Sequence, residues 1–137
     1  MYTVLAIEDN PADALLLKEA FREAGHSCAL EVVPTTAEAR DLLATQWVDL
    51  IVCNMGREPS GCANAIRIIR ENDHLKLVPI IVLSASPNVN DAYQAGATAF
   101  IPKAGDLNTF FSNIKVLLNF WFDAAILPQK PGRAAST

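Results

Sequence analysis

Two apolar runs without polar alternation, DLIVC at 49–53 and VPIIVL at 78–83, constrain the fold of this chain most strongly. A strand with one face in water alternates apolar and polar residues, whereas these runs would present apolar side chains on both faces. They therefore predict strands covered by helices on both sides, as in a parallel sheet. Three further segments have strand character, at 2–7, 28–33 and 98–101.

Helix signals stand between these runs. Asn10-Pro11 is an N-cap followed by proline at the first helical position, and Gly25 stands where a helix starting there would end. Thr35 and Glu38 have the spacing of a capping box. Further helices are expected through Ile66 and Arg70, up to Gly96, and from an Asp106 cap to beyond Trp121.

Five strands alternating with five helices predict an α/β fold: a doubly wound, five-stranded parallel sheet with helices on both faces. The expected strand order is 2-1-3-4-5, the flavodoxin-like order. At 137 residues, 51% of them hydrophobic, the chain fits one domain. We expect that domain to span residues 1–127 and a polar tail to occupy 128–137.

Charge and hydropathy exclude several classes of function. The chain has 11 basic and 15 acidic residues and a net charge of −4. It therefore lacks the excess of basic residues that nucleic-acid binding requires. No apolar run approaches the roughly 20 residues that span a bilayer, and the start, MYTVLAIED, lacks the features of a secretory signal. A cytoplasmic protein is expected, with no nucleic-acid or membrane partner.

The three cysteines, Cys28, Cys53 and Cys62, are odd in number and lack metal-ligand spacing. They favour neither a disulfide framework nor a zinc site. We expect buried or half-buried free thiols.

Polar residues follow four of the expected strands at their carboxyl ends, where ligands bind in sheets of this kind. Carboxylates suit Mg²⁺, and a hydroxyl with a lysine suits the oxygens of a phosphoryl group. Each residue alone could be a solvated loop residue, a strand-end cap or a surface lysine, but their convergence on one sheet edge favours a site. The residues are Glu8, Asp9, Asn54, Ser84 and Lys103.

The stretches VLAIEDNPADALLLKEAF, VPIIVLSAS, AFIPKAGDLNTFF and FWFDAAILP resemble receiver domains of two-component response regulators. Over residues 2 to about 128 the chain is most similar to single-domain regulators paired with bacterial phytochrome histidine kinases. The resemblance implies a histidine kinase partner. It also implies an acidic metal pair, a switch hydroxyl, a switch aromatic residue and a pocket lysine, at Glu8 with Asp9, Ser84, Phe100 and Lys103 respectively.

The main departure from that family is Asn54, which stands at the phosphoacceptor position. Glu58 and Cys62 replace the family's usual proline and glycine. A carboxamide is too weak a nucleophile to form an acyl phosphate, so phosphorylation at Asn54 is expected to fail. Mg²⁺ binding through Glu8, Asp9 and the Gly56 carbonyl is expected to be weak, because a carboxylate is missing.

Two details of the pocket lysine follow. With one carboxylate fewer, Lys103 is expected to contact Asp9 or the amide oxygen of Asn54. The peptide bond before Ala104 is expected to be trans, because a cis bond before a residue other than proline costs about 2.5 to 4 kcal/mol.

The last helix carries more apolar residues than one sheet face can cover. Leu107, Phe110, Phe111, Ile114, Leu117, Leu118 and Trp121 form the expected core-facing arc, whereas Val116, Phe120, Phe122 and Ile126 are left as a partner surface. A homodimer is expected, although the segment after Phe122 could instead fold back over them. Leu15, expected to be exposed on the first helix, is a candidate contact for a kinase helix or a stray surface leucine.

Three functions are compatible with these patterns. The favoured one is a non-enzymatic signalling module that binds a histidine kinase or a downstream partner without phosphorylation at Asn54. The alternative is an ordinary phospho-accepting response regulator seen as an Asp-to-Asn variant. A nucleotide-binding enzyme is disfavoured, because the acidic first loop, EDNPAD, would repel phosphate.

Overall fold

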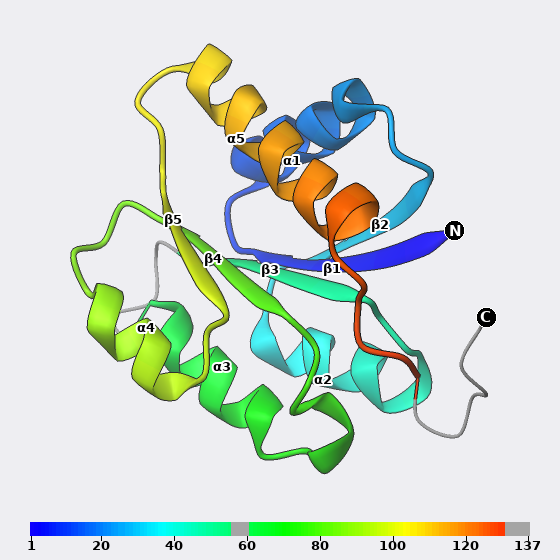
Figure 1. The fold of residues 1–137 in the computed structure, drawn as a ribbon. Coiled ribbons are helices and arrows are strands. Elements are labelled where there is room, and N and C mark those ends of the chain that lie inside the picture. The colour runs from blue at the N-terminus through cyan, green and yellow to red at the C-terminus, as the bar shows by residue number, and fades with distance from the viewer. Residues whose placement is uncertain (56–60, 131–137) are drawn as a thin grey trace.

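The computed structural model describes residues 1–55 and 61–130. Five strands form one parallel sheet in the order β2-β1-β3-β4-β5, which confirms the predicted fold class and topology (Figure 1). The strands are β1 (Tyr2–Glu8), β2 (Cys28–Val33), β3 (Leu50–Asn54), β4 (Ile80–Ser84) and β5 (Ala99–Pro102).

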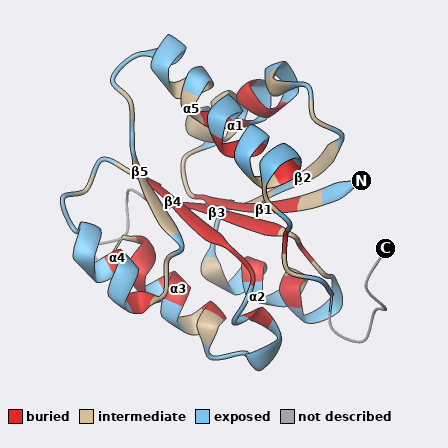
Figure 2. Cartoon of the chain, viewed as in Figure 1, coloured by how far each residue is buried: buried red, intermediate tan, exposed pale blue. Residues whose placement is uncertain are grey.

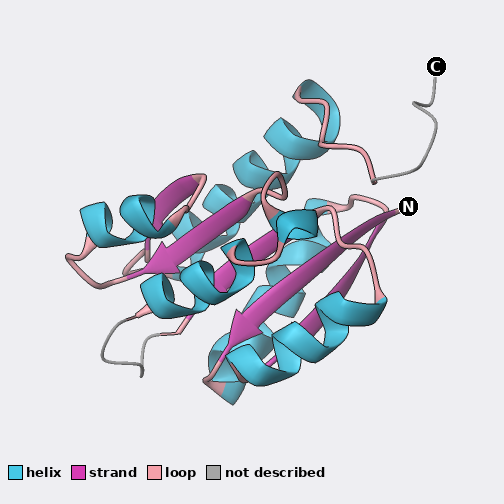
Figure 3. Cartoon of the chain, turned by 90° about the horizontal axis from the view of Figure 1, so that it is seen from below, coloured by secondary structure: helices cyan, strands magenta, loops and turns pink. Residues whose placement is uncertain are grey.

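Helices cover both faces of the sheet, α1 and α5 on one side and α2, α3 and α4 on the other (Figures 1 and 3). In the described parts of the chain they are α1 (Pro11–Ala24), α2 (Thr36–Thr45), α3 (Cys62–Arg70), α4 (Val89–Ala95) and α5 (Leu107–Asn119). A 3₁₀ turn, Asp73–Leu75, follows α3, and a π-helical turn, Phe120–Ala124, extends α5. None of the described helices is long and apolar enough to cross a membrane.

The local sequence signals act as expected at the helix ends. The Asn10 side chain accepts hydrogen bonds from the N–H groups of Ala12 and Asp13, at 2.9 and 3.2 Å, and Gly25 takes the left-handed conformation after α1 with φ of 77°. The Thr35 hydroxyl accepts from the N–H of Glu38 at 3.1 Å. These caps fix where each loop leaves the sheet edge.

Strands β3, β4 and β5 begin one or two residues after their expected first residues, and each ends one residue after its expected last residue. Pro79 has no N–H to donate, so β4 begins at Ile80, although the Pro79 carbonyl still accepts from Ile51 at 2.9 Å. As a result Asn54 and Ser84 are the last residues of their strands rather than the first residues of loops.

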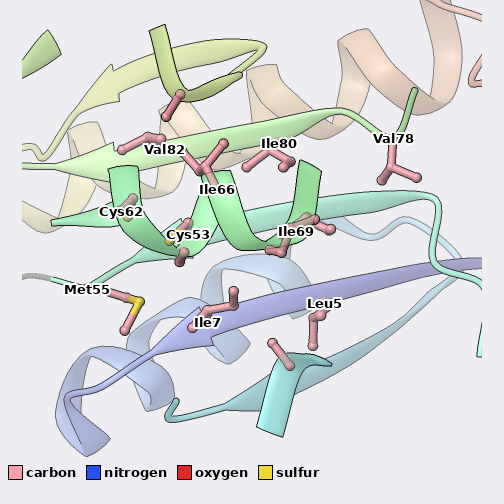
Figure 4. Packing of buried hydrophobic residues seen from close by; sticks show 14 of the residues in the cluster. Leu5, Ile7, Cys53, Met55, Cys62, Ile66, Ile69, Val78, Ile80 and Val82 are labelled. Carbon is pink, nitrogen blue, oxygen red and sulfur yellow. The ribbon is translucent and has the colours of Figure 1, made fainter. Parts of the chain in front are cut away.

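The sheet separates two apolar cores. Along β3, Ile51 and Cys53 face α2, α3 and α4, whereas Leu50 and Val52 face α1 and α5. Figure 2 shows the central strands as the most buried part of the molecule, and Figure 4 shows the first of these cores. Both faces are covered, which explains why the central strands need no polar alternation.

Helix α5 buries only part of its expected arc. Ile114, Leu117 and Leu118 are buried, but Leu107 is exposed. The first turn of α5 lies beyond the carboxyl end of β5, so that the sheet cannot cover Leu107 (Figure 1).

Phe122 corrects the sequence interpretation, which assigned it to the partner surface. It is only 8% exposed, its ring stacks on Tyr2 with centroids 4.3 Å apart, and His26 contacts its edge. The π-helical turn changes the direction of side chains after α5, so that Phe122 reaches the start of β1 and joins the core.

Candidate functional site

The residues expected at the site lie at one edge of the sheet, where the strands end. Glu8 is the last residue of β1 and pairs in register with Asn54, the last residue of β3. Ser84 ends β4 opposite Pro102, so that Lys103 follows directly. The parallel topology thus brings these side chains together from distant parts of the chain.

Asn54 and Glu8 form the buried centre of this edge. The Asn54 amide nitrogen donates to Glu8 Oε1 at 2.6 Å, and the backbone N–H of Asn10 donates to Glu8 Oε2 at 3.1 Å. Glu8 is 4% and Asn54 7% exposed, and both belong to the buried polar residues. Each carboxylate oxygen of Glu8 therefore already has a hydrogen-bond donor.

Burial raises the pKa of the Glu8 carboxyl to about 7, because the charged form loses its hydration. The N–H of Asn10 and the charge of Lys103 act in the opposite direction and lower this pKa, while the nearby charges of Asp13 and Asp9 raise it further. Glu8 therefore titrates near neutral pH.

Lys103 corrects another expectation. Its Nζ donates to Asp13 Oδ2 at 2.7 Å, where the sequence analysis expected a contact with Asp9 or with the Asn54 oxygen. Asp13 lies in the first turn of α1 and faces the loop between β5 and α5. Sequence reasoning missed Asp13; its position three residues after the Asn10 cap is the signal that could have found it.

The loop around Lys103 has ordinary backbone geometry. Its N–H donates to the Ser84 carbonyl at 2.9 Å, which continues the pairing of β4 with β5. The peptide bonds of the described residues are trans, including the one before Ala104, as expected.

A cavity of about 230 Å³ opens beside Glu8, Asn54 and Lys103. Its remaining walls are largely apolar and come from α1, β4 and the start of α5, with Leu16, Leu17, Leu83, Leu107 and Phe110 among the lining residues. Glu8 thus lies at the edge of a cavity with largely apolar walls and is itself only 4% exposed.

Ser84 and Phe100 lie at a second, much smaller space of about 10 Å³. The Ser84 hydroxyl accepts from the N–H of Ser86 at 3.0 Å. Phe100 is half-buried against the core of α2, α3 and α4, and its N–H donates to the Tyr93 hydroxyl at 3.1 Å. The switch roles that the family resemblance implies for Ser84 and Phe100 stay predictions.

The described residues fit a divalent cation only weakly. Glu8 and Asp9 supply two carboxylates, but both Glu8 oxygens already accept hydrogen bonds, and at neutral pH part of the Glu8 population is protonated. Gly56, the third expected ligand, lies outside the described residues. No group of three or more His, Cys, Asp and Glu side chains suited to a metal occurs within 1–55 and 61–130.

The expected partner surface is exposed apart from Phe122. On α5 and the segment after it, Val116, Phe120 and Ile126 are exposed, Ile126 by 91%. The Phe120 ring packs edge-on against Trp121 with centroids 5.1 Å apart, which leaves its outer face free of the core. Leu15 is exposed on α1, as expected.

Comparison with known proteins gives one family match. Residues 4–115 match the family described as the response regulator receiver domain. A curated relative, the response regulator Rcp1 of Synechocystis, is 23% identical over 135 residues, which cover 91% of this chain and 92% of Rcp1.

Three solved structures of response regulators have the same fold. The phosphorylated cyanobacterial phytochrome response regulator RcpA has a TM-score of 0.84 at 25% identity and covers 93% of this chain and 99% of its own. The Mn²⁺-bound form of Rcp1 has a TM-score of 0.82 at 22% identity, with 94% and 100% covered. RPA3017, a response regulator in red light signalling of R. palustris, has a TM-score of 0.80 at 24% identity, with 94% and 99% covered.

Proposed function

Because the chain belongs to the response regulator receiver domain family, we propose that it is a two-component signalling module that works without phosphorylation at Asn54. In this proposal it is not an enzyme. It binds a histidine kinase or a downstream partner through its helical surfaces.

The hydrogen bond between Asn54 and Glu8 carries this proposal. An acyl phosphate forms only when a carboxylate oxygen attacks phosphorus, and Asn54 presents a neutral carboxamide. Its nitrogen donates to a buried carboxylate at 2.6 Å, so the side chain is held in place by a contact that an aspartate could not make while both groups are ionised. Asn54 therefore fits a stable unphosphorylated state.

The relatives indicate the class of partner. Rcp1 is a response regulator, and RcpA is a cyanobacterial phytochrome response regulator. We therefore favour a histidine kinase of the bacterial phytochrome type. Leu15, exposed on α1, supplies an apolar contact for a kinase helix.

The proposal includes a homodimer and a weak Mg²⁺ site. Val116, Phe120 and Ile126 leave an apolar surface that a second copy would cover by two-fold symmetry. Glu8, Asp9 and the Gly56 carbonyl are the proposed ligands for Mg²⁺, with low affinity because Asn54 adds no charge.

Phosphorylation of this chain and of its Asn54→Asp variant tests the proposal directly. After incubation with acetyl phosphate and Mg²⁺, intact mass should show no phosphoryl adduct on the wild type and an adduct on Asn54→Asp that hydroxylamine removes. Asn54→Gln is the matched control and should stay unlabelled. A hydroxylamine-sensitive adduct on the wild type contradicts the proposal, and a folded but unlabelled Asn54→Asp means that the surrounding pocket is misassigned.

Binding to a candidate phytochrome kinase tests the second part of the proposal, namely that the chain binds its partner without being phosphorylated. The wild type should bind the kinase with the same affinity whether or not the kinase has been autophosphorylated with ATP. Phosphotransfer to Asn54→Asp, and none to the wild type, should accompany this result.

A second candidate function is an ordinary phospho-accepting regulator of which this chain is an Asp-to-Asn variant. It is favoured because Glu8, Asp9, Ser84 and Lys103 lie at one edge of the sheet, where a phosphoacceptor would need them. Sequencing of the native gene separates the two, because an Asp codon at position 54 would establish the variant.

A further inference from the structure

Cys53 and Cys62 meet in the core beside Asn54. Strand alternation points Cys53 toward the face that α3 covers, and Cys62 is the first residue of α3. Both are buried in the same core cluster, and the two thiols interact with each other. Figure 4 shows the two side chains together in this cluster.

The surroundings distinguish the two thiols chemically. The hydrogen bonds from the Cys53 thiol and from the backbone N–H of Met55 lower the pKa of the Cys62 thiol, against the opposing effect of burial. The N-terminus of α3 favours negative charge at the same place. Donation of its proton and burial raise the pKa of Cys53. Cys62 is therefore the better nucleophile of the pair.

A small space lies beside Cys62. The space of about 10 Å³ near Ser84 and Phe100 is also lined by Cys62 and Gly61. That volume is close to the minimum that holds one water molecule. Cys62 lines this space and is 5% exposed, whereas Cys53 is 1% exposed, so Cys62 is the more accessible of the two thiols.

We propose that Cys53 and Cys62 are a peroxide-sensitive dithiol that closes to an intramolecular disulfide next to Asn54. The Cys62 thiolate attacks one oxygen of hydrogen peroxide; the S–O bond forms, the O–O bond breaks, and the leaving hydroxide takes a proton to become water. The Cys53 thiol then attacks the sulfenic sulfur; the S–S bond forms, the S–O bond breaks, and the leaving hydroxide takes the Cys53 proton to become a second water. Two thiols are oxidised by two electrons and one peroxide is reduced to two waters.

The disulfide would tie the end of β3 to the start of α3. Oxidation would therefore join Cys53, next to Asn54, covalently to the first residue of α3. The third cysteine, Cys28, packs against the opposite core, and burial raises the pKa of its thiol. Cys28 is thus an internal control in the same chain.

Thiol counting and peptide mapping test this directly. After treatment with hydrogen peroxide and alkylation in denaturant, the number of alkylated cysteines should fall from three to one, and a thiol reductant should restore all three. Trypsin cleaves after Arg57, which separates Cys53 and Cys62 onto two peptides, 41–57 and 58–67. Non-reducing mass spectrometry should show these two peptides linked.

Variants complete the experiment. In Cys28→Ser, the number of alkylated thiols should fall from two to none after peroxide treatment. In Cys62→Ser, both remaining thiols should stay free and be alkylated. Three alkylated thiols in treated wild type, a linkage through Cys28, or sulfinic acid at Cys62 with Cys53 unlinked would each overturn the proposal. The wild-type map decides the question even where a variant fails to fold, and none of these measurements depends on a kinase.

Discussion

At position 54 a single amide changes the electrostatics of the sheet edge. The distance of 2.6 Å between Asn54 and Glu8 suits a donor and a carboxylate, but two ionised carboxylates at that distance would repel each other. An aspartate there would need a cation or a proton to neutralise it. The amide removes that need.

Asn54→Asp should therefore bind Mg²⁺ at least roughly tenfold more tightly than the wild type, since a third carboxylate joins Glu8 and Asp9. Titration followed by tryptophan fluorescence or by NMR measures both affinities. Asn54→Gln controls for the loss of the native amide geometry. Equal affinities of wild type and Asn54→Asp would show that charge at position 54 does not control the metal.

Glu8 makes stability depend on pH. Its folded pKa of about 7 lies above the ordinary value of 4.5, so the folded state binds the proton more tightly than the unfolded state. The stabilisation is fully present below about pH 4.5 and is lost as pH rises through 7. Over this range the free energy of unfolding should lose up to about 3 kcal/mol through Glu8.

Urea unfolding at several pH values, with a chelator to remove metal ions, measures this loss. Glu8→Gln keeps a neutral side chain of the same shape and should flatten the pH dependence between 5 and 7. Exposed Glu23→Gln is the matched control and should leave the slope unchanged. A Glu8→Gln slope identical to that of the wild type would contradict the assigned titration.

Among the elements, α3 is joined by its last residue, Arg70, to the segments that lead into β4 and β5. The Arg70 guanidinium donates to the carbonyls of Leu75, Val78 and Gly96 at 2.6 to 3.1 Å. A side chain at Gly96 would collide with Arg70, because a Cβ there would lie 2.9 Å from the Arg70 Cγ. Arg70 thus supplies donors for carbonyls at the ends of three segments.

Arg70→Ala should lower the free energy of unfolding by about 2 to 4 kcal/mol, since several half-buried carbonyls lose a charged donor. Chemical denaturation measures the change. Arg67→Ala, on the exposed face of the same helix, is the control and should stay within about 0.5 kcal/mol of the wild type. A loss of similar size in both variants would indicate a general effect of charge on α3.

At the scale of the whole molecule, the end of α5 and the segment after it carry exposed apolar side chains. Phe120 is 53% exposed, and Val116 and Ile126 are exposed nearby in the chain. Within the part of the chain that the structure describes, the segment after Phe122 buries Leu127 but leaves Ile126 in solvent, so residues 123–130 do not cover this surface. A second copy is the simplest cover.

Phe120→Asp should convert a homodimer to a folded monomer, because a charge would be buried without a partner in the interface. Sedimentation at micromolar concentration gives the mass, and circular dichroism gives the fold. Leu77→Asp, an exposed leucine between α3 and β4, is the matched control and should remain dimeric. A monomeric wild type refutes the dimer, and an unfolded Phe120→Asp would place Phe120 in the core.

The sequence by itself determined the strands, their parallel order and the set of residues at their carboxyl ends. These features follow from local rules: apolar runs without alternation, caps such as Asn10 and Thr35, and the geometry of right-handed crossovers. Asn54 could be assigned to the phosphoacceptor position by counting residues along the strand that was expected to begin at Asp49. The buried residues of α5 could be predicted from a local rule as well, because its apolar side chains recur with the period of a helix.

Only the tertiary structure decided which partners these residues take. Lys103 pairs with Asp13 because α1 and the loop after β5 approach in space, and no spacing in the chain encodes that approach. Phe122 is buried because a π-helical turn directs it toward Tyr2, more than a hundred residues earlier. The contact of Cys53 with Cys62 likewise depends on how α3 packs on β3. Side-chain contacts of this kind depend on packing across the whole domain, which local periodicity does not specify.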